Sequence, residues 1–439
     1  MWTPRERPRK TGRVLRRLTF PAGFLWGTST SAHQVEGGNE NNDWSEWERR
    51  PGAINGGTGS GAACGWWEGR AEEDLSAAAA GGQNAHRLSL EWSRLEPEPG
   101  RFDDLAFARY AQLLDEMRRL GLRAMVTLYH VTLPRWIARR GGWTSWDTAG
   151  SFARYAQECA RRLAPRVPLW VTINEPAACA AAGYALTYWP PGLGSNRMAL
   201  RALAVMLEAH ASAYREMKQV ARDARIGIVL SAPRIEPARA SLPDRAVAWA
   251  QDWAFLGATV RSLETGVLQP PIIGRRARVP GLGGSVDFLG VNYYGRYAVH
   301  FDLRSPGLLF GKHVQEPTIR TGGCDWGEIS PAGLTRQLLR LSRLGAPLYV
   351  TENGIRDSDD ALRPSFLREH VAAVHEAIRL GADVRGYFHW SLVDNFEWAE
   401  GWVPRFGLHA LDRVTQRRTA RRSAGVYADI CRTNGLEAP

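Results

Sequence analysis

The sequence has 439 residues, of which 44% are hydrophobic and 23% charged, an ordinary globular composition. No run of about 18 apolar residues is present, so we expect neither a transmembrane helix nor a membrane partner. The net charge of +11 could indicate a nucleic-acid partner, but the arginines are spread along the chain and no nucleic-acid-binding motif accompanies them. We therefore predict no nucleic-acid partner.

The first 17 residues form a basic extension that lacks the apolar segment of a secretory signal. We expect one folded domain over residues 18–439. The cysteines are odd in number and show no CxxC spacing, which argues against a disulfide framework and a structural zinc site; they are Cys64, Cys159, Cys179, Cys324 and Cys431. Because we expect the cysteines to be reduced and see no secretory signal, we predict a cytoplasmic protein.

Short runs rich in β-branched and aromatic residues alternate with long amphipathic segments. The strand-like runs are residues 24–30, 84–92, 123–130, 168–175, 225–231, 286–294, 347–353 and 385–392. The helical segments between them include residues 105–120, 148–163, 198–222, 244–263, 331–344 and 364–380. This alternation is typical of parallel strands joined by crossover helices. It predicts an α/β protein built as a single (β/α)8 TIM barrel.

Several strand-like runs are apolar through their middles and finish on polar or aromatic residues. These residues are Gln34, soon after the first run, and His130, Asn174, Glu175, Asn292, Tyr294, Glu352, Asn353 and Trp390. In a barrel, the carboxyl ends of the strands line the active-site face. Glycine-rich residues 52–65 and 307–324 are expected to form long loops over that face.

Two glutamates occupy matching positions at strand ends. Glu175 lies in Val-Thr-Ile-Asn-Glu-Pro at 171–176, and Glu352 lies in Val-Thr-Glu-Asn-Gly-Ile at 350–355. A single glutamate of this kind is more often structural than catalytic. Here, however, two of them are expected at the same active-site face of the barrel. Glycoside hydrolysis needs one carboxyl group to protonate the leaving oxygen and another to attack the anomeric carbon or activate water. The pair predicts a glycosidase.

Ordered motifs strengthen this interpretation from residue 18 to residue 427. They are the 20–37 segment Phe-Pro-Ala-Gly-Phe-Leu-Trp-Gly-Thr-Ser-Thr-Ser-Ala-His-Gln-Val-Glu-Gly, Glu-Trp-Ser-Arg-Leu at 91–95, Thr-Leu-Tyr-His at 127–130, Thr-Ile-Asn-Glu-Pro at 172–176, Asn-Tyr-Tyr at 292–294, Thr-Glu-Asn-Gly at 351–354, and Trp-Ser-Leu-Val-Asp-Asn-Phe-Glu-Trp at 390–398. Each motif is weak alone. Together and in this order, they resemble glycoside hydrolase family 1, the β-glucosidase and β-galactosidase family.

The resemblance implies that Glu175 is the acid/base and that Glu352 is the nucleophile, which forms a covalent glycosyl-enzyme. Glu175 has to be protonated at the working pH, so we expect burial and the charge of Glu352 to raise its pKa. The resemblance also implies supporting residues around the pair: Arg87 and Tyr294 beside the nucleophile, Asn174 on the sugar 2-hydroxyl, and Asn292.

Sugar recognition needs directional polar groups around the hydroxyls and an aromatic surface under the ring. The resemblance implies hydroxyl contacts from Gln34, His130, Glu397 and Trp398, a stacking platform at Trp390, and Phe406 near the C6 end of the sugar. Each has a plainer interpretation as a core residue. No metal or cofactor is expected, because two carboxyl groups suffice for the reaction.

The sequence departs from the family pattern at three places. Val131 and Thr132 stand where Trp-Asp is common, which predicts a smaller wall near the sugar 2- and 3-hydroxyls. Trp326 is displaced within Asp-Trp-Gly-Glu at 325–328, so the aglycone preference cannot be inherited. Glu91 stands where many members have serine or isoleucine. In this it resembles a branch of the family whose members often accept both glucosides and galactosides.

We predict a retaining β-glycosidase acting on terminal non-reducing β-D-glucosides, and also on β-D-galactosides and β-D-fucosides. The substrate partner would be a small β-glycoside or an oligosaccharide. A transglycosylating β-glycosidase remains an alternative, since it needs the same residues. An inactive carbohydrate-binding homologue is disfavoured because both glutamates are present. A 6-phosphoglycosidase is disfavoured because Glu397 would repel a phosphate. The oligomeric state and the aglycone stay open.

Overall fold

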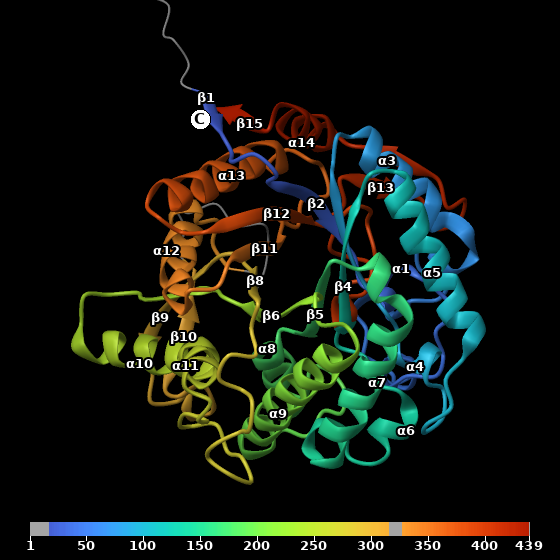
Figure 1. The fold of residues 1–439 in the computed structure, drawn as a ribbon. Coiled ribbons are helices and arrows are strands. Elements are labelled where there is room, and N and C mark those ends of the chain that lie inside the picture. The colour runs from blue at the N-terminus through green and yellow to red at the C-terminus, as the bar shows by residue number, and fades with distance from the viewer. Residues whose placement is uncertain (1–16, 316–326, 439) are drawn as a thin grey trace, which may run out of the picture.

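The computed structural model describes residues 17–315 and 327–438. Residues 1–16 of the basic extension, together with Cys324 and Trp326, lie outside these ranges. Eight parallel strands close into a barrel in the order β11-β12-β2-β3-β4-β5-β6-β8 (Figure 1). Their bounds are β2 Leu25–Ser29, β3 Ala85–Ser89, β4 Arg123–Tyr129, β5 Leu169–Asn174, β6 Arg225–Ser231, β8 Phe288–Asn292, β11 Leu348–Asn353 and β12 Val384–Trp390. The predicted (β/α)8 barrel is confirmed.

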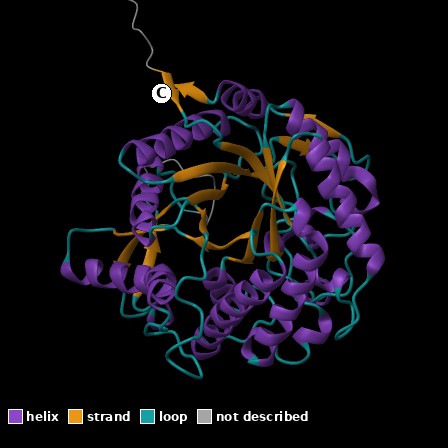
Figure 2. Cartoon of the chain, in the orientation of Figure 1, coloured by secondary structure: helices purple, strands orange, loops and turns teal. Residues whose placement is uncertain are grey.

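Helices form a layer outside the strands, as Figure 2 shows. The longer ones are α3 Ala71–Ala80, α5 Asp104–Arg119, α7 Asp147–Leu163, α9 Asn196–Val220, α12 Pro331–Leu341, α13 Arg363–Arg379 and α14 Arg422–Thr433. Helix α5 illustrates their construction. The Asp103 side chain accepts hydrogen bonds from the amides of Leu105 and Ala106 at its start, which satisfies donors that the helix itself leaves unpaired. Its apolar face, including Phe107 and Leu114, is buried against the barrel.

The helix expected over residues 244–263 is present but interrupted. It comprises α10 Leu242–Asp252, a π-helical turn at Trp253–Gly257, and α11 Ala258–Thr265. A Cβ atom at Gly257 would lie 2.8 Å from the Trp253 ring, so glycine is what lets the widened turn pack against that indole. Hydrophobic periodicity does not reveal one extra residue in a turn.

Strands outside the barrel complete the fold. A three-stranded sheet, in the order β10-β9-β7, is formed by β7 Arg234–Pro237, β9 Arg296–Phe301 and β10 Gly311–Val314. Part of the loop expected over 307–324 is therefore a strand, because β10 pairs with β9 in antiparallel register. The first and last strands of the described residues, β1 Arg17–Thr19 and β15 Gly435–Glu437, pair with each other in antiparallel register.

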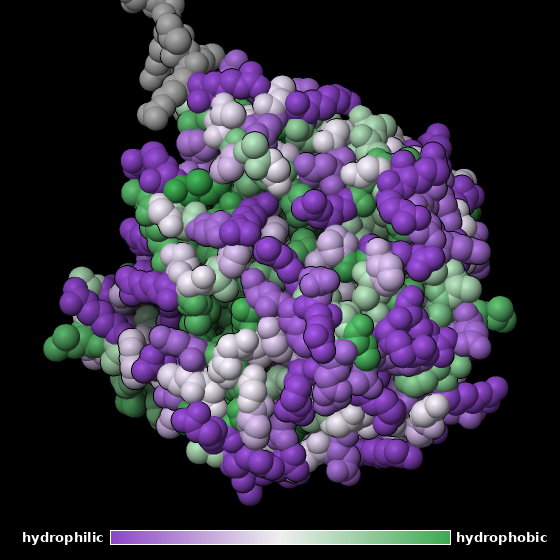
Figure 3. Space-filling view, viewed as in Figure 1, coloured by the Kyte–Doolittle hydropathy of each residue, from purple (hydrophilic) through white to green (hydrophobic). Residues whose placement is uncertain are grey.

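Apolar side chains fill the barrel interior below the active-site face. They come from all eight barrel strands and are Leu25, Ala85, Met125, Leu169, Val171, Val229, Phe288, Tyr349 and Phe388. The barrel interior is therefore a packed core. Figure 3 shows hydrophilic residues over most of the viewed surface. Within the described ranges, no helix combines the length and apolar character needed to cross a bilayer.

Candidate active site

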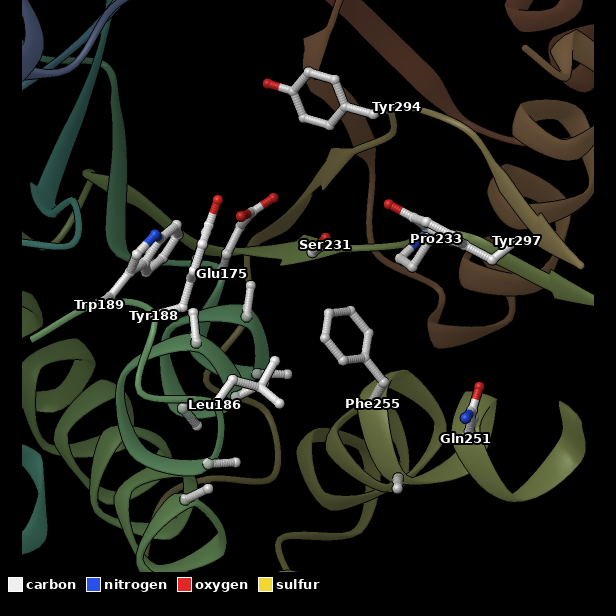
Figure 4. A pocket seen from close by; sticks show the side chains of 18 of the residues that line it. Glu175, Leu186, Tyr188, Trp189, Ser231, Pro233, Gln251, Phe255, Tyr294 and Tyr297 are labelled. Carbon is white, nitrogen blue, oxygen red and sulfur yellow. The ribbon is translucent and has the colours of Figure 1, made fainter. Parts of the chain in front are cut away.

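A cavity of about 800 Å³ opens beyond the carboxyl ends of the barrel strands. Glu175, directly after β5, and Glu352, on β11, both line it. Figure 4 shows the Glu175 carboxyl group pointing into this space. The structure thus places both predicted carboxyl groups at one cavity.

The backbone at each glutamate is specifically shaped. Glu175 has a φ of 48°, a left-handed conformation that is uncommon for a residue other than glycine. It turns the chain sharply from β5 into the short helix α8 Pro176–Ala180. Near Glu352, a Cβ atom at Gly354 would lie 2.0 Å from the Trp390 carbonyl oxygen. Glycine therefore lets the end of β11 pass close to the end of β12.

Glu352 is held by two donors. The Arg87 guanidinium, fully buried on β3, donates from Nη1 to Glu352 Oε1 at 2.6 Å. The Tyr294 hydroxyl donates to the other carboxylate oxygen at 2.8 Å. These two bonds fix both oxygens of the Glu352 carboxyl group in place.

Two amides connect Glu352 to Glu175. Arg87 Nη2 donates to Asn174 Oδ1 at 2.7 Å. Asn292 Nδ2 donates to the same Asn174 oxygen at 3.2 Å and to Glu175 Oε1 at 3.0 Å. The Thr351 hydroxyl in turn fixes the Asn292 carbonyl at 2.7 Å. A continuous hydrogen-bond network therefore sets the positions of both carboxyl groups.

The two carboxyl groups differ in electrostatic environment. Burial, and next the charge of Glu352, raise the pKa of Glu175 from its usual 4.5 to about 8, although the Asn292 hydrogen bond acts in the opposite direction. Glu175 is thus protonated at neutral pH and can donate a proton. Burial and the same Glu352 charge raise the pKa of Tyr294, which keeps its hydroxyl a donor.

Glu397 lines the cavity beside this pair and is held by Gln34. Gln34 Nε2 donates to the Phe396 carbonyl at 2.7 Å, to Asn395 Oδ1 at 3.1 Å and to Glu397 Oε2 at 3.3 Å. Burial and the Glu352 charge raise the pKa of Glu397 to about 8. Gln34 is itself fully buried.

Aromatic rings form one side of the cavity. The His130 ring lies nearly parallel to the Trp390 and Trp398 rings, with centroid separations of 6.0 and 6.3 Å. His130 Nε2 is 3.3 Å from Asn174 Nδ2. Burial, and next the Arg87 charge, lower the pKa of His130 well below its usual value, so the imidazole is neutral. Phe406 is buried and contacts the Tyr294 ring edge-on.

The structure connects two departures that sequence reasoning treated separately. Val131 lines the cavity with a φ of 73°, which is a genuine outlier for a β-branched residue. The next residue, Thr132, donates from its hydroxyl to the buried Glu91 carboxylate at 2.9 Å. Glu91 also accepts from the Ser93 hydroxyl at 2.7 Å. Only a strand-pairing argument, placing β3 beside β4, could have brought positions 91 and 132 together from sequence.

The sequence-based prediction did not include a further part of the cavity wall. Residues 177–185 supply alanines to the lining, directly after Glu175. The visible signal was the run Pro-Ala-Ala-Cys-Ala-Ala-Ala-Gly-Tyr-Ala at 176–185.

Within residues 17–315 and 327–438, no group of His, Cys, Asp or Glu is arranged to hold a metal ion, and the cysteines that the structure describes are free and buried.

Comparison with known proteins gives matches along nearly the whole chain. The model for Glycosyl hydrolase family 1 matches residues 16–436. Beta-glucosidase A of Thermotoga maritima is 32% identical over 95% of this chain and 99% of its own length. A Beta-galactosidase of Sulfolobus acidocaldarius is 32% identical over 95% and 96%. The solved structure of a beta-glycosidase from Pyrococcus horikoshii matches with a TM-score of 0.88 and 37% identity, covering 96% of each chain.

Proposed function

Since the chain belongs to glycosyl hydrolase family 1 and is a glycosyl hydrolase of the β-glucosidase type, we propose that it is a retaining enzyme. It cleaves terminal non-reducing β-D-glucosides, and also β-D-galactosides and β-D-fucosides, by double displacement. The observation that carries the proposal is the network through Arg87, Asn174 and Asn292, which joins Glu352 to Glu175 at one cavity.

In the first step, Glu352 attacks the anomeric carbon as the bond to the aglycone oxygen breaks, and Glu175 gives its proton to that oxygen. The high pKa of Glu175 supports this role, because the group carries a proton at neutral pH. The Arg87 and Tyr294 bonds to Glu352 support its role as the anionic nucleophile.

In the second step, water hydrolyses the glycosyl ester. Once Glu352 is esterified its charge is gone, and with it one cause of the raised pKa of Glu175. That pKa falls, so Glu175 can now accept a proton from the attacking water. The same carboxyl group therefore acts first as acid and then as base. No cofactor enters this scheme.

The sugar-binding roles follow from position. The Asn174 oxygen accepts from Arg87 and Asn292, each of which contacts one of the two carboxyl groups, and in this position Asn174 would hold the 2-hydroxyl. Glu397, His130 and Trp398 would bind the remaining hydroxyls, and Trp390 would stack on the ring. Gln34 would bind a hydroxyl as well, and its amide would orient Glu397.

Azide rescue tests the two catalytic roles. In Glu352→Ala, azide should restore turnover and yield the α-glycosyl azide, because it attacks in place of the missing nucleophile. In Glu175→Ala, azide should yield the β-glycosyl azide, because it attacks the intact glycosyl-enzyme. The reverse assignment of products would mean that the roles are exchanged.

Nuclear magnetic resonance of the wild-type reaction tests retention directly. The first sugar released from an aryl β-D-glucoside should be the β-anomer, whereas initial release of the α-anomer would rule out double displacement. The cytoplasmic location is a separate proposal, which cell fractionation would test.

A further inference from the structure

Alanines of one helical segment line the outer part of the cavity. Ala178, Ala181, Ala182 and Ala185 all line it, and they lie on α8 and the π-helical turn Ala181–Ala185. Their spacing of three, four and seven residues places them on one side of a helix. A methyl group occupies little volume and offers no hydrogen bond, so this wall is wide and apolar.

Larger apolar side chains surround the same space. Leu186 and Leu309 line the cavity and are 55% and 44% exposed, and Phe255 lies on the π-helical turn that interrupts the α10–α11 segment. Figure 4 shows Leu186 and Phe255 across the opening from Tyr294. Apolar groups kept in water at the mouth of a cavity mark a surface that a ligand covers.

Two polar side chains of this outer region are engaged within the protein. Gln251 donates from its amide to the Leu308 and Gly311 carbonyls at 2.7 and 2.8 Å, and its oxygen lies 3.2 Å from the His313 ring. The Tyr188 hydroxyl donates to Glu400. The hydroxyls of a second sugar would have to compete for these groups, whereas an apolar surface would not.

We propose that the enzyme is selective for β-glycosides whose aglycone is large and apolar, rather than for disaccharides or oligosaccharides. This inference rests on the proposed function, because the aglycone leaves from the Glu175 side of the cavity. The alanine face and the exposed leucines would then cover the aglycone, while the sugar occupies the polar end beside Glu352.

The test compares kcat/KM for methyl, butyl, hexyl and octyl β-D-glucosides, each below its micelle-forming concentration, with kcat/KM for cellobiose. We expect an increase of about two- to fourfold per added methylene and octyl glucoside at least about tenfold above cellobiose. A series that does not increase with chain length, or a preference for cellobiose, would overturn the inference. Failure to cleave any of these compounds or 4-nitrophenyl β-D-glucoside would instead refute the proposed function.

Variants locate the effect in this wall. Ala181→Leu should lower the octyl-to-methyl ratio of kcat/KM by about tenfold, because the added side chain occupies the space of the aglycone. Leu186→Gln, at an exposed position that folding tolerates, should lower the same ratio by about threefold. The matched control is Ala108→Leu on the exposed side of α5, which should leave the ratio unchanged. If both wall variants keep the wild-type ratio, the alanine face does not bind the aglycone.

Discussion

The two ends of the cavity are built in opposite ways. At the inner end, Arg87 and Asn292 each bond two different side chains of the site, so the position of each group depends on its neighbours. At the outer end, alanines and exposed leucines line the wall, and the polar groups of Gln251 and Tyr188 are bonded within the protein. Chemistry needs atoms fixed in place, whereas an aglycone needs only space and an apolar surface. Substitutions at the inner end should therefore have much larger effects.

The largest expected effect is the loss of the proton donor. Glu175→Gln should lower kcat for methyl β-D-glucoside by about 10²- to 10⁴-fold, because the methoxide leaving group needs a proton. For 2,4-dinitrophenyl β-D-glucoside, whose leaving group needs none, glycosylation should be nearly unaffected. Stopped-flow measurement of the initial burst for the two substrates would check this difference.

The same variant has a pH signature. Glu175 is active in its protonated form and its pKa is raised to about 8, so wild-type kcat/KM should decrease as the pH rises through about 8. With the dinitrophenyl substrate, Glu175→Gln should lack this decrease. A basic limb that persists in the variant would show that another group controls it.

The next effect concerns the buried cation. Arg87→Met leaves the Glu352 carboxylate buried without its ion pair, and should lower the free energy of unfolding by about 3–5 kcal/mol as well as strongly reducing turnover. Urea unfolding would measure the loss. The control is Arg385→Met, which breaks a half-exposed pair with Asp383 and should cost at most about 1 kcal/mol. Equal losses in the two variants would remove the contrast between fixed and solvated charges.

The barrel was predictable because its signals are local. Each strand needs a short run of β-branched and aromatic residues, and all eight runs overlap observed strands. The helix over 244–263 was only partly predictable, since the turn at Trp253–Gly257 depends on ring packing against Gly257. Strand β10 was not predictable, because its pairing with β9 compensates for a glycine-rich sequence with low strand propensity.

The candidate site was predictable in identity rather than in geometry. Glu175 and Glu352 are recognisable at strand ends, but the bonds from Asn292 to both Asn174 and Glu175 depend on the register of neighbouring strands. Likewise, nothing in the sequence indicated that the Gln34 amide donates to Glu397 and to the Phe396 carbonyl. Side-chain contacts of this kind follow from packing, which sequence motifs do not encode.

A third, intermediate effect lies at the boundary between the two ends. Val131→Trp should restore an aromatic wall beside His130 and change the ratio of β-glucosidase to β-galactosidase kcat/KM by about 10- to 100-fold, or else lower both by overpacking. The φ of 73° is uncommon for tryptophan as it already is for valine, so the substitution does not change which backbone conformation is required.

The control is Val131→Gly, which removes the side chain without filling the wall and should not sharpen the preference. For the wild type we expect glucoside, galactoside and fucoside to differ by no more than about 100-fold. A wild-type discrimination above about 1,000-fold would show that hydroxyl contacts, not this wall, control selectivity.

The smallest effect is a cost in stability at the polar end. Glu397 has a folded-state pKa of about 8 against its usual 4.5, so the folded protein binds the proton more tightly than the unfolded chain. The resulting stability is complete below about pH 4.5 and is lost as the pH rises through about 8. Glu397→Gln keeps an oxygen that can accept from Gln34 but cannot ionise. Its Tm relative to wild type should therefore increase by about one to a few degrees between pH 5 and pH 8. The matched control, Glu68→Gln at an exposed position, should show no such trend. A Tm difference that stays constant across this range would mean that burial does not raise the pKa of Glu397 in the folded protein. The inner end would then hold its charges by solvation rather than by the fixed network.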